Sequence, residues 1–173
     1  SDFDEWARMG NTGWSWNDVL PMFKRHENNS RGASKYHGIG GELTVSDLQD
    51  PHPIAAKFIE AAKTAGFPYI PDINGEQIEG FAYVQATQKK GWRSSSSRAF
   101  IDPIIKRSNF TVSKNSVARR ILFEGKQAVG VEASIRGKIV RLNVRKEVVV
   151  SAGAIASPQL LMLSGIGDPK ELK

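Results

Sequence analysis

The stretch EVVVSAGAIASPQLLMLSGIGD, residues Glu147 to Asp168, decides the expected fold. It begins with three valines, Val148 to Val150, which predict a fully buried β-strand. Small residues then lead into an apolar helix that we expect to begin near its N-cap Ser157, with Pro158 in the first turn, and to end at Gly165. In α/β proteins this arrangement can bring a ligand close to backbone amides, although the pattern alone favours an ordinary strand–turn–helix of a packed core.

The composition narrows the class of protein. The chain has 173 residues, of which 40% are hydrophobic and 24% charged, as is usual for a globular protein. No apolar run approaches the roughly 20 residues that a membrane span requires. The sequence contains no cysteine, which excludes disulfides, thiolate chemistry and cysteine-based zinc sites in this chain. The absence of cysteine fits both reducing and oxidising cellular compartments.

The net charge of +6 does not indicate a nucleic-acid binder. Such proteins usually concentrate lysine and arginine on one face, with aromatic residues between them. Here the basic residues are scattered, and the densest cluster consists of Lys89, Lys90, Arg93 and Arg98. It lies at predicted strand ends and turns, where solvated charge is a sufficient explanation. We therefore expect no nucleic-acid partner.

Helix and strand signals alternate along the rest of the chain. Predicted helices cover residues 1–10, 15–29, 50–66 and 95–106, and Ser15 with Asp18 has the spacing of a capping box. Predicted strands cover residues 42–45, 81–89, 110–113, 117–123, 128–135 and 138–144. Residues 28–41 and 67–80 are expected to form loops, and long ordered loops often carry function.

The residue types alone reveal no reaction. The three histidines, His26, His37 and His52, lie in unrelated segments without metal-ligand spacing. We interpret each as a surface or loop histidine rather than a ligand or a base. The sequence contains no nucleophile elbow, no G-x-G-x-x-G motif and no Walker loop.

Several blocks, in order, resemble the glucose–methanol–choline (GMC) family of FAD-dependent oxidoreductases. Residues 153–167, GAIASPQLLMLSGIG, resemble the second signature of that family, and residues 13–24, GWSWNDVLPMFK, are similar to one of its helical segments. Three further blocks, YHGIGG at 36–41, DING at 72–75 and RSSSSRAF at 93–100, resemble the arthropod branch, which includes glucose dehydrogenases of the FAD, quinone type. The matching blocks extend along nearly the whole chain.

This resemblance implies an α/β fold class. The chain would be a mixed α+β fragment with part of a Rossmann-like FAD-binding domain and the beginning of an antiparallel-sheet substrate domain. Residues 1–41 would border the FAD domain as a helical and loop segment, and residues 42–109 would belong to the substrate domain. Residues 110–173 would supply a β-rich excursion and a strand–turn–helix of the FAD domain. We interpret the chain as an internal piece, since the family's amino-terminal G-x-G-x-x-G and carboxy-terminal histidine pair are not among its residues.

The resemblance also implies which residues contact the cofactor FAD. Val117, in the segment SVARRI, is similar to the valine whose backbone meets the flavin adenine; a plain buried strand residue is the alternative. The turn that contains Ala152 and Gly153 resembles the one that closes against FAD at the edge of a sheet. We assign no catalytic residue and no metal ligand to this chain.

The implied function is oxidation of a CH–OH donor with hydride transfer to FAD. The expected partners are a small alcohol or sugar substrate and an electron acceptor, without a membrane span. We expect these residues alone to bind FAD poorly and to be inactive. The alternative is a non-catalytic binding module that keeps the GMC fold without redox activity. The resemblance allows a secreted parent protein, whereas the substrate, the acceptor and the oligomeric state stay open.

Overall fold

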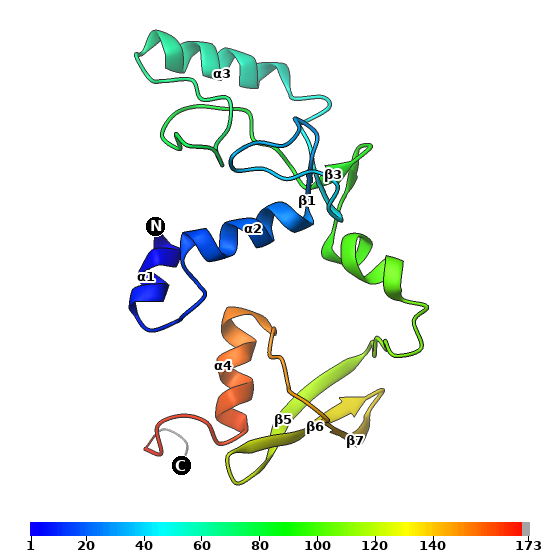
Figure 1. The fold of residues 1–173 in the computed structure, drawn as a ribbon. Coiled ribbons are helices and arrows are strands. Elements are labelled where there is room, and N and C mark those ends of the chain that lie inside the picture. Colours follow the sequence, from blue (N-terminus) through cyan, green and yellow to red (C-terminus); the bar gives the residue numbers. More distant parts are fainter. Residues whose placement is uncertain (171–173) are drawn as a thin grey trace. The chain divides into compact units, whose positions relative to one another are not determined.

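The structure, a computed structural model, describes residues 1–170 in two units, Ser1–Phe110 and the residues from Thr111 onward. The first unit contains α1, α2, β1, β2, α3, β3, β4, a π-helix and a 3-10 helix, and the second contains β5, β6, β7 and α4 (Figure 1). Both units combine helices with strands, so the predicted α/β class is confirmed. None of the helices in residues 1–170 is long and apolar enough to cross a bilayer.

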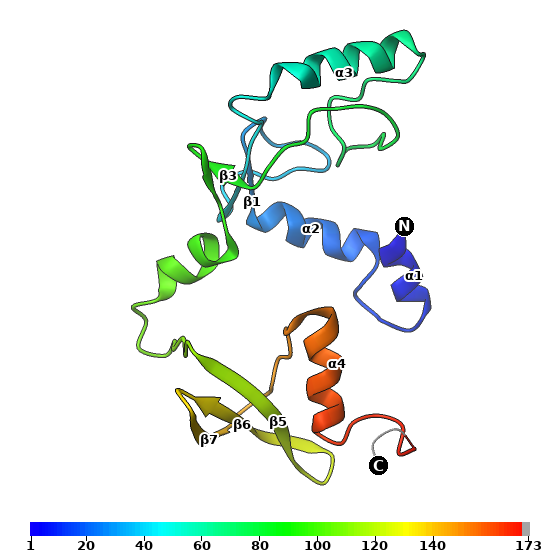
Figure 2. The same ribbon diagram turned by 180° about the vertical axis from the view of Figure 1, so that it is seen from behind.

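Two capped helices begin the first unit, α1 (Asp2–Arg8) and α2 (Trp16–His26). The predicted capping box of α2 is confirmed: the Ser15 hydroxyl accepts the Asp18 N–H at 3.3 Å, and the Asp18 carboxylate accepts the Ser15 N–H at 3.0 Å. The Asp4 carboxylate accepts the Trp16 N–H at 3.0 Å and thereby ties α1 to the start of α2. Seen from behind, α2 leads from α1 to β1 (Figure 2).

A short parallel strand pair follows α2. β1 (Glu27–Asn29) pairs with β2 (Leu43–Val45), so the prediction of helix up to residue 29 is wrong for its last three residues, whereas strand 42–45 is essentially confirmed. The backbone leaves the helix and becomes extended at Glu27, where the loop between β1 and β2 packs directly on the end of α2. A Cβ at Gly38 would overlap the backbone carbonyl of Lys24, and one at Gly41 would overlap the backbone of His26. Glycine is therefore required at both positions.

The third helix, α3 (Pro53–Thr64), buries Ile59 and Ala62 and ends before Gly66, as predicted. Residues 67–80 form an irregular loop, also as predicted. The strand predicted for residues 81–89 is wrong over most of its length. Only β3 (Gln88–Lys89) is a strand, paired with β4 (Trp92–Arg93), while the rest makes isolated bridges at Phe81 and Ala86.

A continuous α-helix over residues 95–106 was also a wrong prediction. The structure has a π-helix at Ser97–Ile101, labelled η1, and a 3-10 helix at Asp102–Ile104, labelled η2. Pro103 explains the change, since proline has no N–H to donate and its ring hinders the carbonyl one turn earlier. The Ser95 hydroxyl accepts the Arg98 N–H at 3.3 Å near the start of the π-helix.

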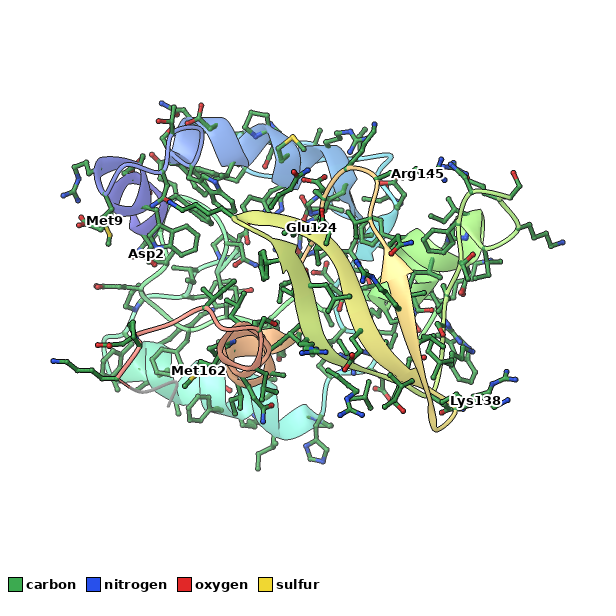
Figure 3. All side chains as sticks on the ribbon, turned by 90° about the horizontal axis from the view of Figure 1, so that it is seen from below. Asp2, Met9, Glu124, Lys138, Arg145 and Met162 are labelled. Atoms are coloured by element: carbon green, nitrogen blue, oxygen red, sulfur yellow. The ribbon has the colours of Figure 1, made fainter. Side chains whose placement is uncertain are left out.

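The second unit is built on an antiparallel sheet in the order β5-β6-β7, comprising Ser116–Glu124, Gln127–Ile135 and Lys138–Asn143. These three strands were predicted, whereas the strand predicted at 110–113 is absent from the structure. The helix α4 (Gly153–Leu163), which carries Met162, lies beside β5 (Figure 3). A hydrogen bond of 2.7 Å from the Ile121 N–H to the Ser164 hydroxyl joins them.

The stretch from Glu147 to Asp168 differs from its predicted form. Val148 to Val150 are not a strand, and the Val149 side chain is 76% exposed, because no strand in residues 1–170 pairs with them. The helix begins at Gly153 instead of near Ser157, whose hydroxyl accepts the Ala152 N–H at 3.0 Å from within the helix. The predicted end at Gly165 is confirmed by a Schellman motif.

Candidate functional site

The three residues predicted to contact FAD lie on two elements of the second unit. Val117 is on β5, an edge strand of the described sheet, and it is 66% exposed within residues 1–170. Ala152 and Gly153 stand together at the start of α4. Within residues 1–170 no hydrogen bond joins either of them to Val117, because α4 is tied to β5 at its opposite end, at Ser164.

The start of α4 has room and hydrogen-bond donors for a ligand. Gly153 has φ of +90°, and the space that a Cβ would occupy there is open. The Ala152 N–H is already bonded to Ser157, but the N–H groups of the first helical turn have no acceptor within the helix. Together with the positive end of the helix dipole, these donors suit an anionic group such as the pyrophosphate of FAD. The residues present therefore fit the cofactor.

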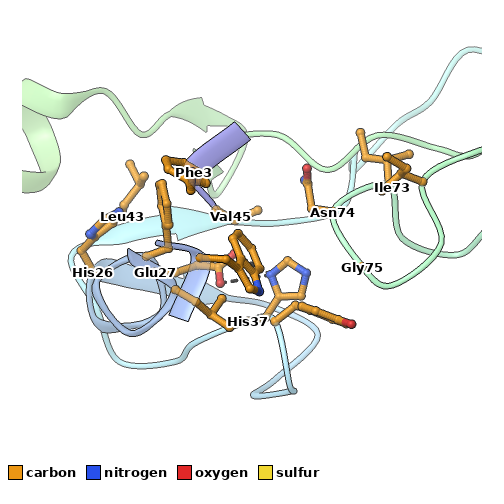
Figure 4. A pocket seen from close by; sticks show the side chains of 14 residues that line it. Phe3, His26, Glu27, His37, Leu43, Val45, Ile73, Asn74 and Gly75 are labelled. Carbon is orange, nitrogen blue, oxygen red and sulfur yellow. Dashed lines mark hydrogen bonds and ion pairs between the residues drawn. The ribbon is translucent and has the colours of Figure 1, made fainter. Parts of the chain in front are cut away.

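A cavity of about 420 Å³ lies in the first unit (Figure 4). Its wall is mainly apolar and includes the side chains of Phe3, Trp16, Leu20, Phe23, Leu43 and Ile78. Polar groups are contributed by Glu27, His37 and the loop residue Asn74. Cavities that combine an apolar wall with a few converging polar groups are typical of small-molecule sites.

One polar feature at this cavity is the ring of His37, which lies between two carboxylates. Its Nδ1 is 2.9 Å from Glu27 Oε1, and its Nε2 is 2.8 Å from Asp72 Oδ2. The His37 side chain is only 12% exposed, and those of Glu27 and Asp72 are 15% and 25% exposed. Both ring nitrogens can donate only when the imidazole is protonated. The ring thus connects β1 to the loop of residues 67–80.

The environment favours the charged forms of His37 and Glu27. Burial lowers the pKa of His37, but the hydrogen bonds and negative charges of Glu27 and Asp72 outweigh it and raise this pKa above its ordinary 6.5. Burial raises the pKa of Glu27, but the Gly38 N–H, His37 and Asn29 outweigh that effect and lower this pKa below 4.5. Perturbed titratable groups at a cavity are typical of functional sites, and also of structural ion pairs.

A buried amide supports this ion-pair network. Asn29 is 4% exposed, and its side-chain nitrogen donates to Glu27 and Gln85, each at 3.1 Å. Its oxygen accepts the Arg31 N–H at 2.9 Å. Asp47 accepts hydrogen bonds from Arg31 at 2.8 Å and from Gln85 at 3.1 Å. The network therefore fixes segments that are far apart in the sequence.

The sequence did not reveal this network. His37 lies in a loop, as interpreted, but it is not a surface residue, since two distant carboxylates enclose it. His52 caps α3 by accepting the Ile54 N–H at 3.2 Å, and His26 lies against the rings of Phe23 and Phe100. The only signal in the sequence was the pair of loop motifs at 36–41 and 72–75, with polar residues next to glycines. Over residues 1–170 no group of three or more acidic or histidine side chains has the arrangement of a metal site.

Comparison with known proteins identifies the class. The family model described as GMC oxidoreductase matches residues 1–172, and the chain belongs to this family of oxidoreductases. The human mitochondrial choline dehydrogenase is 42% identical over 172 residues, and the oxygen-dependent choline dehydrogenase of Photobacterium profundum is 43% identical over 174 residues. These matches cover 99% of this chain but 29% and 31% of the two relatives. The chain therefore spans about three tenths of their length.

Solved structures show the same fold. The crystal structure of pyridoxine 4-oxidase from Mesorbium loti has a TM-score of 0.90 and 31% identity, covering 99% of this chain and 34% of that one. An FAD-dependent oxidoreductase from Chaetomium thermophilum has a TM-score of 0.89 and 27% identity, and the match covers 98% of this chain and 32% of that one. The mixed α/β fold is thus that of GMC oxidoreductases, as predicted. The relatives named here are choline dehydrogenases, so the family is confirmed, but the glucose dehydrogenase branch is not supported.

Proposed function

We propose that the protein containing this chain is an FAD-dependent oxidoreductase that oxidises the CH–OH group of a small alcohol. The observation that carries this proposal is the match of residues 1–172 to the GMC oxidoreductase family, together with the TM-score of 0.90 to an oxidase of known structure. Bound FAD would supply the hydride acceptor. Because the chain spans about three tenths of its relatives, we propose the activity for the whole protein.

In this proposal the second unit supplies part of the FAD site. The backbone of Val117 would meet the adenine, and the turn at Ala152 and Gly153 would close against the cofactor. The open space at Gly153 and the unbonded donors of the first turn of α4 support this assignment.

The first unit would contribute to the substrate side, in line with the prediction that residues 42–109 belong to the substrate domain. The loop that provides Asn74 and Gly75 lines the mainly apolar cavity of the first unit, here called the aromatic cavity, and would form part of the wall of the substrate cleft. Choline is the first candidate substrate, because the most similar relatives named above are choline dehydrogenases. A sugar is the second, and it rests on the blocks at 36–41, 72–75 and 93–100 that resemble the glucose dehydrogenase branch.

The decisive experiment is to purify the full-length protein, record its flavin absorbance and add choline or glucose without oxygen. Loss of the oxidised flavin band with one of these alcohols is the expected result. A flavin that no alcohol in a broad panel reduces, or a protein without flavin, would favour the alternative of a binding module without redox activity. We also infer that residues 1–173 expressed alone bind FAD weakly, and a tight yellow complex would contradict this.

A pair of glycine variants tests whether the turn at Gly153 forms part of the FAD site. Gly153→Leu should lower the FAD content of the purified protein, because the side chain would fill the space proposed for the cofactor. Gly137→Leu is the matched control, since Gly137 has φ of +81° against +90° at Gly153, lies in the same unit and is equally open. Equal FAD content in the two folded variants would show that the turn at Gly153 does not contact the cofactor.

A further inference from the structure

The basic cluster of residues 89–98 lines a second concavity of the first unit, with a volume of about 280 Å³. Four cationic side chains contribute to it, Lys89, Lys90, Arg93 and Arg98, and all four residues are exposed. In residues 1–170 none of the four forms an ion pair with a carboxylate. Glu42 is the one acidic residue of the lining, so four positive charges face one negative charge.

The fold holds these charges together through a tight hairpin. Lys90 and Gly91 connect β3 to β4 with φ of 51° and 77°, the left-handed pair that two-residue hairpin loops of type I′ require. Lys89 stands directly opposite Trp92 across the two strands. Beneath the charged side chains the structure is closed, since Ser94 is 7% exposed and Ala99 is 4% exposed. Lys89, Lys90 and Arg93 are therefore carried by one ordered hairpin that borders the concavity.

An exposed aromatic ring accompanies the charges. The Trp92 side chain is 69% exposed, and the Arg98 guanidinium lies 5.6 Å from the centre of its ring. A cation above an indole face is attracted by the ring quadrupole, so this contact helps to hold the Arg98 side chain beside Trp92. The indole surface that remains open offers a place for an apolar or aromatic part of a ligand.

We propose that this concavity binds a phosphate-type oxyanion with more than one negative charge, carried either by a small molecule or by a lipid headgroup. The planar forks of Arg93 and Arg98 match phosphate oxygens in geometry, and the lysines add point charges. Uncompensated like charges repel one another, so a multivalent anion would remove this repulsion as it binds. The concavity is small, which favours a single headgroup over the extended backbone of a nucleic acid.

This site is separate from the function proposed above. Its lining shares no residue with the aromatic cavity, and it contains none of Val117, Ala152 or Gly153. The inference therefore stands on the arrangement of residues 89–98 alone. Failure to bind an oxyanion here would leave the proposed oxidation of alcohols unaffected.

Calorimetric titration of the full-length, FAD-loaded protein with inorganic pyrophosphate at low salt tests the proposal. The double variant Lys90→Gln/Arg93→Gln should bind roughly tenfold more weakly, because two charge-assisted contacts are lost. The matched control Lys106→Gln/Arg107→Gln makes the same change of charge in the same unit, at residues outside the concavity, and should bind like the unaltered protein. Sedimentation with vesicles of phosphatidylcholine, with and without phosphatidic acid, identifies a lipid as the source of the phosphate group.

Loss of pyrophosphate or phosphatidic acid binding in the first double variant alone would support the site, and the responding probe would identify the source. Equal binding by all three proteins, or no binding of either probe by any of them, would overturn it. So would pyrophosphate binding that disappears once FAD is bound, because the measured site would then be that of the flavin. Binding of single-stranded DNA with higher affinity than pyrophosphate would also refute a small oxyanion as the ligand.

Discussion

Replacing His37 by glutamine removes the ring that joins Glu27 to Asp72. Hydrogen bonds to charged groups contribute about 1.5–3 kcal/mol each to stability, and His37 makes two of them, at 2.9 and 2.8 Å. The carboxylates are 15% and 25% exposed, so solvent screens them only in part. A glutamine amide can keep one bond at most. We therefore expect His37→Gln to lower the free energy of unfolding by about 2–4 kcal/mol near pH 6.

The pH dependence of this loss is the sharper part of the prediction. The folded-state pKa of His37 is raised above 6.5, so its contribution is fully present below pH 6.5 and is lost as the pH rises through the folded-state value. The folded-state pKa of Glu27 is lowered below 4.5, so its contribution is present above pH 4.5 and is lost as the pH falls through its folded-state value. The difference between the parent and the variant should therefore be largest between these two pH values and decline toward alkaline pH.

Urea denaturation of the full-length protein and of His37→Gln, repeated from pH 5 to pH 9, measures this difference. His52→Gln is the control, because it removes a histidine that caps α3 and has no carboxylate partner in residues 1–170, and it should cost about 1 kcal/mol. A difference for His37→Gln that is constant across this range would refute the reasoning. It would mean that the ring acts by packing alone and carries no charge in the folded state.

Two further predictions follow from the structure, one about close packing at Gly38 and one about the buried N–H donor of Ile121. Gly38→Ala should destabilise the first unit by about 3 kcal/mol or more, since its Cβ would overlap the Lys24 carbonyl. Its control Gly40→Ala, at φ of +80° in open space, should cost about 1 kcal/mol. Equal melting temperatures of the two variants would contradict this prediction. Ser164→Ala should cost about 1–3 kcal/mol in urea denaturation, because it leaves the N–H of the buried Ile121 without its acceptor at 2.7 Å. The exposed Ser116→Ala is its control, and a similar cost for both would be evidence against the argument.

The local features of the fold were predictable because neighbouring residues cause them. The capping box at Ser15 and Asp18 and the glycine that ends α4 at Gly165 depend on residues within a few positions of one another, and short turns join the three strands of the second unit. The predictions failed where a partner was needed. Val148 to Val150 have the composition of a strand, but a strand exists only when another strand accepts and donates its hydrogen bonds, and none in residues 1–170 does so.

By itself the sequence determined the family, the α/β class and the residues proposed to face FAD, since each of these is written in short contiguous blocks. Only the tertiary structure decided that His37 connects Glu27 to Asp72, and that the lysines and arginines of residues 89–98 share one concavity. The physical reason is the same in both cases. The pKa of a side chain and the ligand it can bind depend on charges and burial in space, and a chain brings distant residues together only when it folds.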